Sequence, residues 1–245
     1  MRSLRVLLCL AILLPLSLAG GAAEAGGRHQ GEVFYLCYHD RSGSRYEIWK
    51  GCKARADDST YKTPILLRNG RRIAPNRMHI YLRNGTSRVP EVFPNGLRWL
   101  AGRPGATSRQ RGWEKRYFWQ CGDTSASRHY ATPPDCPRAS SGEGEHALTL
   151  IVKFPQCWDG HRLRYPRRNR YCPSDTTVVP RIEVHVQYTI EDGASGAPLR
   201  LSTGSIYGIH ARFKEGWVRS VLSLYIRECI AAGISCHVRS DGEIS

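Results

Sequence analysis

The spacing of the cysteines constrains the fold of this chain more than any other feature of its sequence. Nine cysteines are present, and all but Cys9 come after the first 25 residues. The other eight are Cys37, Cys52, Cys121, Cys136, Cys157, Cys172, Cys229 and Cys236. Taken in order as neighbouring pairs, they are separated by 15, 15, 15 and 7 residues.

This repeated spacing favours disulfides between sequence neighbours. We predict the pairs Cys37–Cys52, Cys121–Cys136, Cys157–Cys172 and Cys229–Cys236. Other connectivities remain open, because pairing cannot be derived from sequence alone. A zinc site would instead need close pairs such as C-x-x-C, which the chain lacks. We therefore expect disulfides, and neither a metal site nor another cofactor.

The first 25 residues have the pattern of a secretory signal peptide. Arg2 and Arg5 precede an apolar run from Val6 to Leu18, and Ala23-Glu24-Ala25 fits a cleavage site between small residues. A membrane anchor is the weaker alternative, because a spanning helix needs roughly 20 apolar residues. We expect cleavage of residues 1–25 and one secreted domain over residues 26–245 without a transmembrane segment, in a compartment that permits disulfides.

The chain is strongly basic, with a formal net charge of +15. Loss of Arg2, Arg5 and Glu24 with the leader would leave 34 basic and 20 acidic residues, a net charge of +14. Such a charge favours anionic partners through a long-range attraction that salt weakens.

Strand signals dominate the mature chain. Segments rich in β-branched and aromatic residues span residues 32–38, 77–83, 116–121, 146–154, 181–190 and 205–213. In the fifth segment, alternation predicts a buried face formed by Ile182, Val184, Val186, Tyr188 and Ile190. Residues 103–115 and 122–145 have the composition of exposed loops.

One stretch, residues 215–233, has apolar residues at helical spacing and ends at Gly233, a typical C-terminal cap. We therefore predict a mainly β, antiparallel, sandwich or jelly-roll-like single domain with one C-terminal helix and four disulfides.

Several segments resemble a known family. They include "VPEVFPNGLRWLAGRPGA" (89–106), "FPQCWDG" (154–160) and "GSIYGIHARFKEGW" (204–217). In this order they resemble the secreted family called "domain of unknown function nineteen ninety-six", found in actinobacteria and filamentous fungi, of which the chain is identified as a divergent member. The resemblance implies an extracellular domain and supplies no reaction.

The resemblance carries over Trp158, Asp159, His210 and Trp217, but members usually have an Asp-His and a further His where this chain has arginines. Asp159 and His210 are the candidate catalytic pair, because a carboxylate beside an imidazole suits acid–base chemistry. The structural alternative is a turn at Asp159 and a buried, hydrogen-bonded His210. No G-x-S-x-G, H-E-x-x-H or phosphate-loop motif occurs.

The second candidate site is the segment between Cys157 and Cys172, residues 158–171, here called the arginine loop. Its candidate ligand-binding residues are Arg162, Arg164, Arg167, Arg168, Arg170, Tyr165 and Trp158, with Trp217 from the family motif. Guanidinium groups bind phosphate, sulfate and carboxylate groups in bidentate fashion and stack on aromatic rings. A disulfide across the loop would reduce the entropy lost on binding. The alternative is a solvent-exposed loop without a binding role, whose arginines reflect an arginine-biased proteome.

These observations favour a non-catalytic secreted module that binds an anionic extracellular polymer, either an anionic polysaccharide or another cell-envelope polymer such as a wall glycan. Specific nucleic-acid binding is not expected. The alternative is a carbohydrate-active enzyme with its site around Asp159 and His210. Whether the chain is an enzyme stays open from the sequence, with a non-catalytic role favoured.

Overall fold

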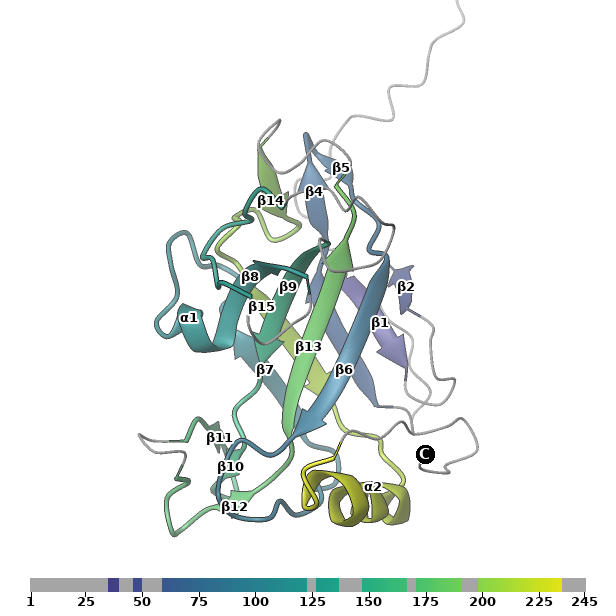
Figure 1. The fold of residues 1–245 in the computed structure, drawn as a ribbon, viewed down its shortest axis with the longest axis vertical. Coiled ribbons are helices and arrows are strands. Elements are labelled where there is room, and N and C mark those ends of the chain that lie inside the picture. Colours follow the sequence, from purple (N-terminus) through teal and green to yellow (C-terminus); the bar gives the residue numbers. More distant parts are fainter. Residues whose placement is uncertain are drawn as a thin grey trace, which may run out of the picture. The chain divides into compact units, whose positions relative to one another are not determined.

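The computed structural model describes residues 59–122, 127–136, 147–166, 171–190 and 198–234, together with the backbone of 35–39 and 46–49. All of them belong to one compact unit that spans residues 31–245. The unit is mainly β with antiparallel sheets, which confirms the predicted fold class (Figure 1).

Two antiparallel sheets form the body of this unit. The five-stranded sheet has the order β2 (Tyr46–Trp49), β1 (Tyr35–His39), β3 (Thr60–Pro64), β15 (His210–Lys214), β7 (Arg98–Gly102). The four-stranded sheet has the order β6 (Arg77–Arg83), β13 (Arg181–Tyr188), β9 (Leu148–Lys153), β8 (Tyr117–Cys121). In Figure 1, β6 and β13 lie in front of the five-stranded sheet.

The main core lies between these sheets because each contributes one apolar face. Ala211 and Phe213 of β15 and Tyr61 of β3 contribute from the five-stranded sheet, and Leu150 and Val152 of β9 contribute from the other. The predicted face of β13 is confirmed: Ile182, Val184, Val186 and Tyr188 belong to the core, and Ile190 packs against it partly buried. Alternation along a strand produces this arrangement.

Two small three-stranded sheets occupy opposite ends of the body (Figure 1). One has the order β14 (Leu199–Leu201), β4 (Leu66–Arg68), β5 (Arg71–Arg72). The other has the order β11 (Leu163–Arg164), β10 (Cys157–Trp158), β12 (Thr177–Val178). The arginine loop begins in this second small sheet.

The predicted C-terminal helix is present. It consists of α2 (Arg219–Tyr225), which continues into a π-helical turn over Ile226–Ile230. Gly233 follows it with a φ of 69°, as expected for a cap. A short helix not predicted from the sequence, α1 (Trp113–Arg116), interrupts the expected loop at 103–115. Within the described ranges, none of the helices has the length and hydrophobicity that crossing a bilayer requires.

The two disulfides that lie within the described residues, Cys121–Cys136 and Cys157–Cys172, confirm the predicted pairing there. Cys229 is also disulfide-bonded. Its predicted partner Cys236 lies outside the described residues, as does Cys52, the predicted partner of Cys37.

The predicted strands at 77–83, 116–121, 146–154 and 181–190 correspond to β6, β8, β9 and β13 within two residues at each end. The strand expected at 205–213 begins only at His210. Before it, the side chain of Gln110 donates to the carbonyls of Tyr207 and Ile209, at 2.8 and 2.7 Å. These side-chain hydrogen bonds hold the segment in a turn, which the apolar pattern of the sequence does not reveal.

Candidate functional site

The start of the arginine loop is a tight hairpin held by Asp159. The Asp159 carboxylate accepts hydrogen bonds from the backbone N–H groups of His161 and Arg162, at 2.9 and 2.6 Å. Its other oxygen lies 2.7 Å from the guanidinium of Arg164. The two backbone N–H groups and then Arg164 hold the pKa of Asp159 below its ordinary value. Asp159 is therefore an ionised turn residue that orients the first part of the loop.

The disulfide fixes the two ends of the loop to each other. Cys157 lies in β10, and Cys172 lies 5.4 Å away between Cα atoms. Together with Val178 of β12 they form a small buried cluster of their own. Because β10 pairs with both β11 and β12, the loop starts and ends on an ordered three-stranded base.

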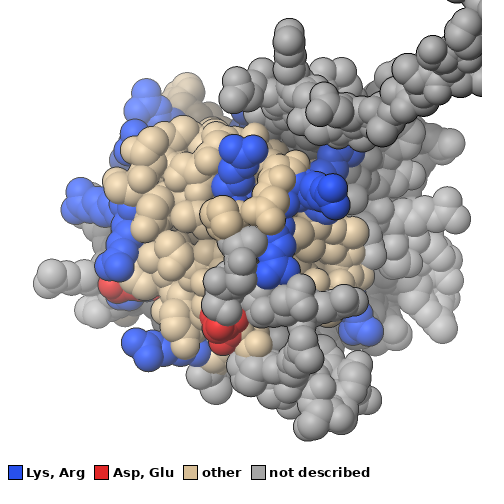
Figure 2. Space-filling view, turned by 90° about the horizontal axis from the view of Figure 1, so that it is seen from above, with Lys and Arg blue, Asp and Glu red and all other residues tan. Residues whose placement is uncertain are grey.

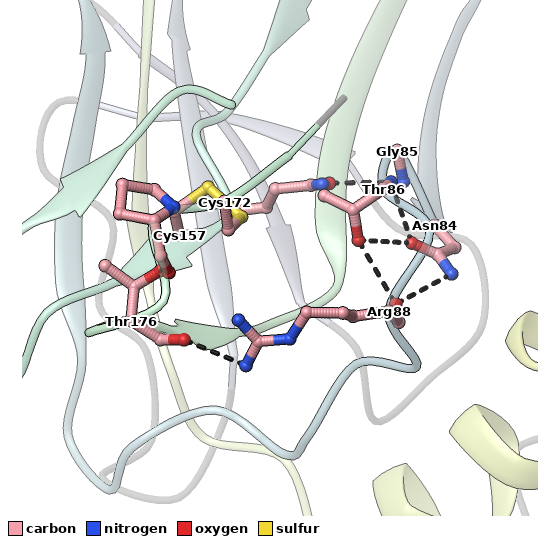
Figure 3. The surroundings of a disulfide bond; sticks show 9 residues. Asn84, Gly85, Thr86, Arg88, Cys157, Cys172 and Thr176 are labelled. Atoms are coloured by element: carbon pink, nitrogen blue, oxygen red, sulfur yellow. Dashed lines mark hydrogen bonds between the residues drawn. A yellow bond between two sulfur atoms is a disulfide. The ribbon is translucent and has the colours of Figure 1, made fainter. Parts of the chain in front are cut away.

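This base is attached to the body through the segment that follows β6 (Figure 3). The N–H of Gly85 donates to the side-chain oxygen of Gln156 at 3.2 Å, and Arg88 donates to the carbonyl of Thr176 at 2.9 Å. A Cβ atom at Gly85 would overlap the ends of the Arg181 and Gln156 side chains, so a larger residue here would have to displace both. Two hydrogen bonds from the segment after β6 therefore attach the base of the loop to the body.

Tyr165 anchors the middle of the loop rather than presenting its ring to solvent. Its hydroxyl donates to the carbonyl of Lys153 at 2.9 Å and also contacts the hydroxyl of Tyr117. The guanidinium of Arg116 covers its ring, 3.7 Å from the centroid. Burial, and then the neighbouring Tyr117, raises the pKa of Tyr165 well above its ordinary value. Tyr171, which is 58% exposed, is the accessible aromatic side chain of the loop.

The remaining loop arginines divide into two groups. Arg162 and Arg164 are exposed at the hairpin of β10 and β11. Arg167, Arg168 and Arg170 lie outside the described residues. Asp175 is exposed just beyond Cys172 and is the acidic residue that follows the loop most closely.

The two candidate tryptophans belong to different parts of the domain. Trp158 is half-buried in β10 and packs against the main core. Trp217 follows β15, also packs against that core, and its indole N–H donates to the hydroxyl of Tyr61 at 3.3 Å. The structure therefore groups Trp158 with Arg162 and Arg164, and places Trp217 beside β3.

His210 lies in the five-stranded sheet, whereas Asp159 lies in the turn between β10 and β11 of the small sheet. The His210 side chain is fully buried, and its Nδ1 lies 2.8 Å from the carbonyl of Gly208. Burial lowers the pKa of His210, more than the Gly208 carbonyl raises it, so the imidazole is neutral near pH 7. With Nδ1–H donating to Gly208, the remaining ring nitrogen is an acceptor.

Sequence reasoning missed a buried charge cluster on the outer face of the four-stranded sheet. Glu183 of β13 is only 3% exposed. Its carboxylate lies 2.5 Å from Arg181, 3.5 Å from Lys153 and 4.0 Å from Arg83. Burial alone would raise the pKa of Glu183, but His185, Arg181 and Lys153 together lower it to about 2. The sequence contains a signal for this cluster, because Glu183 and His185 alternate with the apolar residues of the strand.

This cluster adjoins the arginine loop through Lys153. The ammonium group of Lys153 lies near Glu183, and its carbonyl accepts the hydrogen bond from Tyr165. At a pKa of about 2, Glu183 is ionised at neutral pH and cannot serve as a general acid there. Its role in this geometry is to hold three cations at the base of the loop. Within the described residues, His, Cys, Asp and Glu form no group of three or more that could hold a metal ion.

Comparison with known proteins gives one match. Residues 38–217 match the family model described as "Domain of unknown function (DUF1996)". No curated protein and no solved structure matches the chain.

Proposed function

Because the chain belongs to the DUF1996 family, whose description assigns no activity, we propose from its own residues that it is a non-catalytic module for binding an anionic extracellular polysaccharide. The arginine loop is the proposed binding surface. Secretion, expected from the leader, is part of this proposal, and the disulfides are consistent with an oxidising compartment.

The ordered base of the loop is the observation that carries the proposal. Five arginines lie between Cys157 and Cys172. The disulfide, the Asp159 turn and the Tyr165 anchor each restrain this segment before any ligand arrives. A polymer that binds a loop already restrained at its ends and at Tyr165 loses less entropy than one that must order all of it. The exposed ring of Tyr171 adds a surface on which a sugar ring can stack.

The site residues also favour binding over catalysis. The Asp159 carboxylate is already committed to two backbone N–H groups and Arg164. His210 is fully buried in another sheet, so direct contact with a polymer would require the sheet to open. These environments suit structural roles for both residues, while five cations in one loop suit the recognition of sulfate or carboxylate groups.

The test is binding to immobilised dextran sulfate and polygalacturonate, with neutral dextran as the reference polymer. Wild-type protein should bind both anionic polymers at about 0.1 M salt and should lose most of this binding near 1 M, where the Debye length is only about 3 Å. Arg167→Glu plus Arg168→Glu should weaken binding at least about tenfold, since four units of charge change in one loop.

The matched control is Arg98→Glu plus Arg111→Glu, which makes the same change in net charge at two exposed positions outside the loop. It should weaken binding only slightly. Binding that is absent, that resists salt, or that falls equally in both variants would contradict the proposal. Tighter binding to single-stranded DNA of equal charge would show that the polymer class is wrong.

The alternative, a carbohydrate-active enzyme around Asp159 and His210, has a separate readout. Release of new reducing ends from any of these polymers by the wild-type protein, abolished in His210→Gln with an unchanged melting temperature, would replace the binding proposal by the enzymatic one. We expect no release.

A further inference from the structure

The end of the domain opposite the arginine loop carries a second arginine-rich element, the β4–β5 hairpin with β14 beside it (Figure 1). Its sequence, "LLRNGRR" (66–72), turns at Asn69 and Gly70, whose φ angles are 50° and 77°. Two consecutive positive φ angles are typical of the type I′ turn, for which Asn-Gly is the favoured pair. We call Arg68, Arg71, Arg72 and Arg200 the hairpin arginines.

The register of this small sheet gathers the hairpin arginines. Arg68 is directly opposite Arg71, and Leu67 lies between Arg72 on one side and Arg200 on the other. The Arg200 guanidinium reaches the turn, 3.7 Å from the position that a Cβ of Gly70 would occupy. Directly opposed like charges repel each other, and this register concentrates positive charge at the hairpin.

The hairpin is nevertheless firmly attached. Ile65 and Leu66 at its start and Leu201 of β14 are fully buried. The N–H of Ile65 donates to the Ser202 hydroxyl at 3.1 Å, and the N–H of Ser202 donates to the Ile65 carbonyl at 2.8 Å. Arg71, Arg72 and Arg200 are exposed on this rigid support. Figure 2, which looks down on this end, shows Lys and Arg atoms more prominently than Asp and Glu atoms.

Strand β6 separates the two basic ends. Asn76, just before β6, donates to the carbonyl of Gln187 near the hairpin end. Arg83, the last residue of β6, pairs with Arg181 beside the base of the arginine loop. Seven antiparallel residues span about 24 Å, so the ends are too far apart to form one compact site. The spacing suits two separate contacts.

From these contacts we infer that the hairpin arginines bind a second chain of the same anionic polysaccharide, more weakly than the arginine loop binds the first, so that one molecule bridges two chains. The inference rests on the proposed function, since it assigns the first chain to the arginine loop. Recognition is by the same chemistry at both ends, guanidinium groups against sulfate or carboxylate. Because the two surfaces face different ends of the domain, each chain has room to bind without displacing the other.

A two-step capture experiment tests the bridge. Protein is first bound to immobilised dextran sulfate at about 0.1 M salt, and free fluorescent dextran sulfate is then added. The first step reports single-chain binding, and the retained fluorescence reports the second chain. Wild-type protein should retain the fluorescent chain. Arg71→Glu plus Arg72→Glu should keep most of the first-step binding, because exposed charges act mainly on ligands close to them. The same variant should retain at least about fivefold less fluorescence than the wild-type protein.

The control is again Arg98→Glu plus Arg111→Glu, which should keep both steps, and melting temperatures confirm that each variant folds. Absence of first-step binding by the wild-type protein overturns the proposed function, and the bridge with it. First-step binding without capture overturns the bridge alone and leaves the proposed function standing. Capture that survives the hairpin variant, or falls equally in the control, also overturns the bridge.

Discussion

Two loops of this protein are closed by disulfides of the same sequence separation, and they differ in almost everything else. Cys121–Cys136 and Cys157–Cys172 each span 15 residues with Cα atoms 5.4 Å apart. The first loop contains one arginine and two aspartates, a formal charge of −1. The arginine loop contains five arginines and one aspartate, a formal charge of +4. The same covalent constraint therefore closes two loops of very different charge.

The loops also differ in how the rest of the chain holds them. In the first loop, the His129 ring stacks on Phe118 at 3.6 Å between centroids, and Tyr130 pairs with Trp119 at the edge of β8. The arginine loop instead contributes β11 to a separate small sheet with β10 and β12. The comparison teaches that the disulfide limits the conformations of a loop, while its side chains decide what the loop contacts.

Lys153 lies between the two loops. Its carbonyl accepts the hydrogen bond from Tyr165 of the arginine loop, and its ammonium group lies 5.4 Å from the ring centroid of Phe118, on which His129 stacks. Glu183 holds this ammonium group. The buried carboxylate therefore links the supports of both loops.

The largest expected effect follows from removing this shared support. Glu183→Gln should lower the free energy of unfolding by about 3 to 5 kcal/mol, because Arg181 and Lys153 would lose their buried partner. Urea unfolding measures the change. Glu228→Gln is the control, since this exposed carboxylate pairs with Arg227 at the surface and should contribute less than about 1 kcal/mol. Equal effects of the two substitutions would refute the role assigned to Glu183.

Acid should lower the free energy of unfolding of the wild-type protein by most of the amount expected for Glu183→Gln. The pKa of Glu183 is about 2 in the folded state, against an ordinary value of 4.5. Its contribution of about 3 kcal/mol is complete above pH 4.5 and is lost as the pH falls toward 2. Burial lowers the pKa of His210, so protonation of the unfolded chain adds a second loss that begins below pH 6.5.

Unfolding by urea across this pH range is the measurement, with the Glu183→Gln variant alongside. The variant should keep the loss attributed to His210 and show a much smaller dependence below pH 4.5. A variant as acid-sensitive as the wild type would assign the acid transition to other groups.

Removing either disulfide should cost nearly the same stability. Replacing both cysteines of one pair by alanine should lower the free energy of unfolding by about 3 kcal/mol in the chain-entropy account, which depends on loop length alone. Binding should separate the two variants, because only Cys157→Ala plus Cys172→Ala releases the arginines. Affinity for dextran sulfate should fall in this variant and not in the Cys121→Ala plus Cys136→Ala variant. Equal loss of affinity in both would remove the distinction between the loops.

The smallest expected effect tests the anchor. Tyr165→Phe removes the hydrogen bonds of its hydroxyl to the Lys153 carbonyl and the Tyr117 hydroxyl, and should cost about 1 to 2 kcal/mol, since one such bond usually contributes about 1 kcal/mol. Tyr171→Phe, at an exposed ring, should leave the stability unchanged. Thermal unfolding compares the two. A larger loss of stability in Tyr171→Phe than in Tyr165→Phe would contradict the assignment of Tyr165 as the anchor of the loop.

Periodic signals in the sequence predicted the strands that carry the core. The segment of β6 was predicted from its content of β-branched and aromatic residues. The apolar face of β13 was predicted from alternation, because a half-buried strand needs one apolar residue in two. The two-residue strands β10, β11 and β12 were not predicted. Strands this short have no period to detect, and they form here because a disulfide and a turn carboxylate hold them together.

The candidate site was only partly predictable for a related reason. The arginines and the bracketing cysteines are visible in the sequence, and the disulfide between Cys157 and Cys172 was predicted from spacing. The anchoring of Tyr165 by Lys153 was not, because it depends on where β9 runs relative to the loop. Asp159 was foreseen as a turn or a catalytic residue, and its contact with Arg164 shows it in a turn.

The sequence by itself determined the β class, the C-terminal helix and the excess of positive charge, and its cysteine spacing favoured the pairing that the described residues contain. These follow from composition and from patterns a few residues long. Only the tertiary structure decided that Glu183 is buried among cations, that His210 is sealed within a sheet, and that two basic elements lie at opposite ends of β6. Each of these depends on contacts between residues far apart in the chain, which local patterns do not specify.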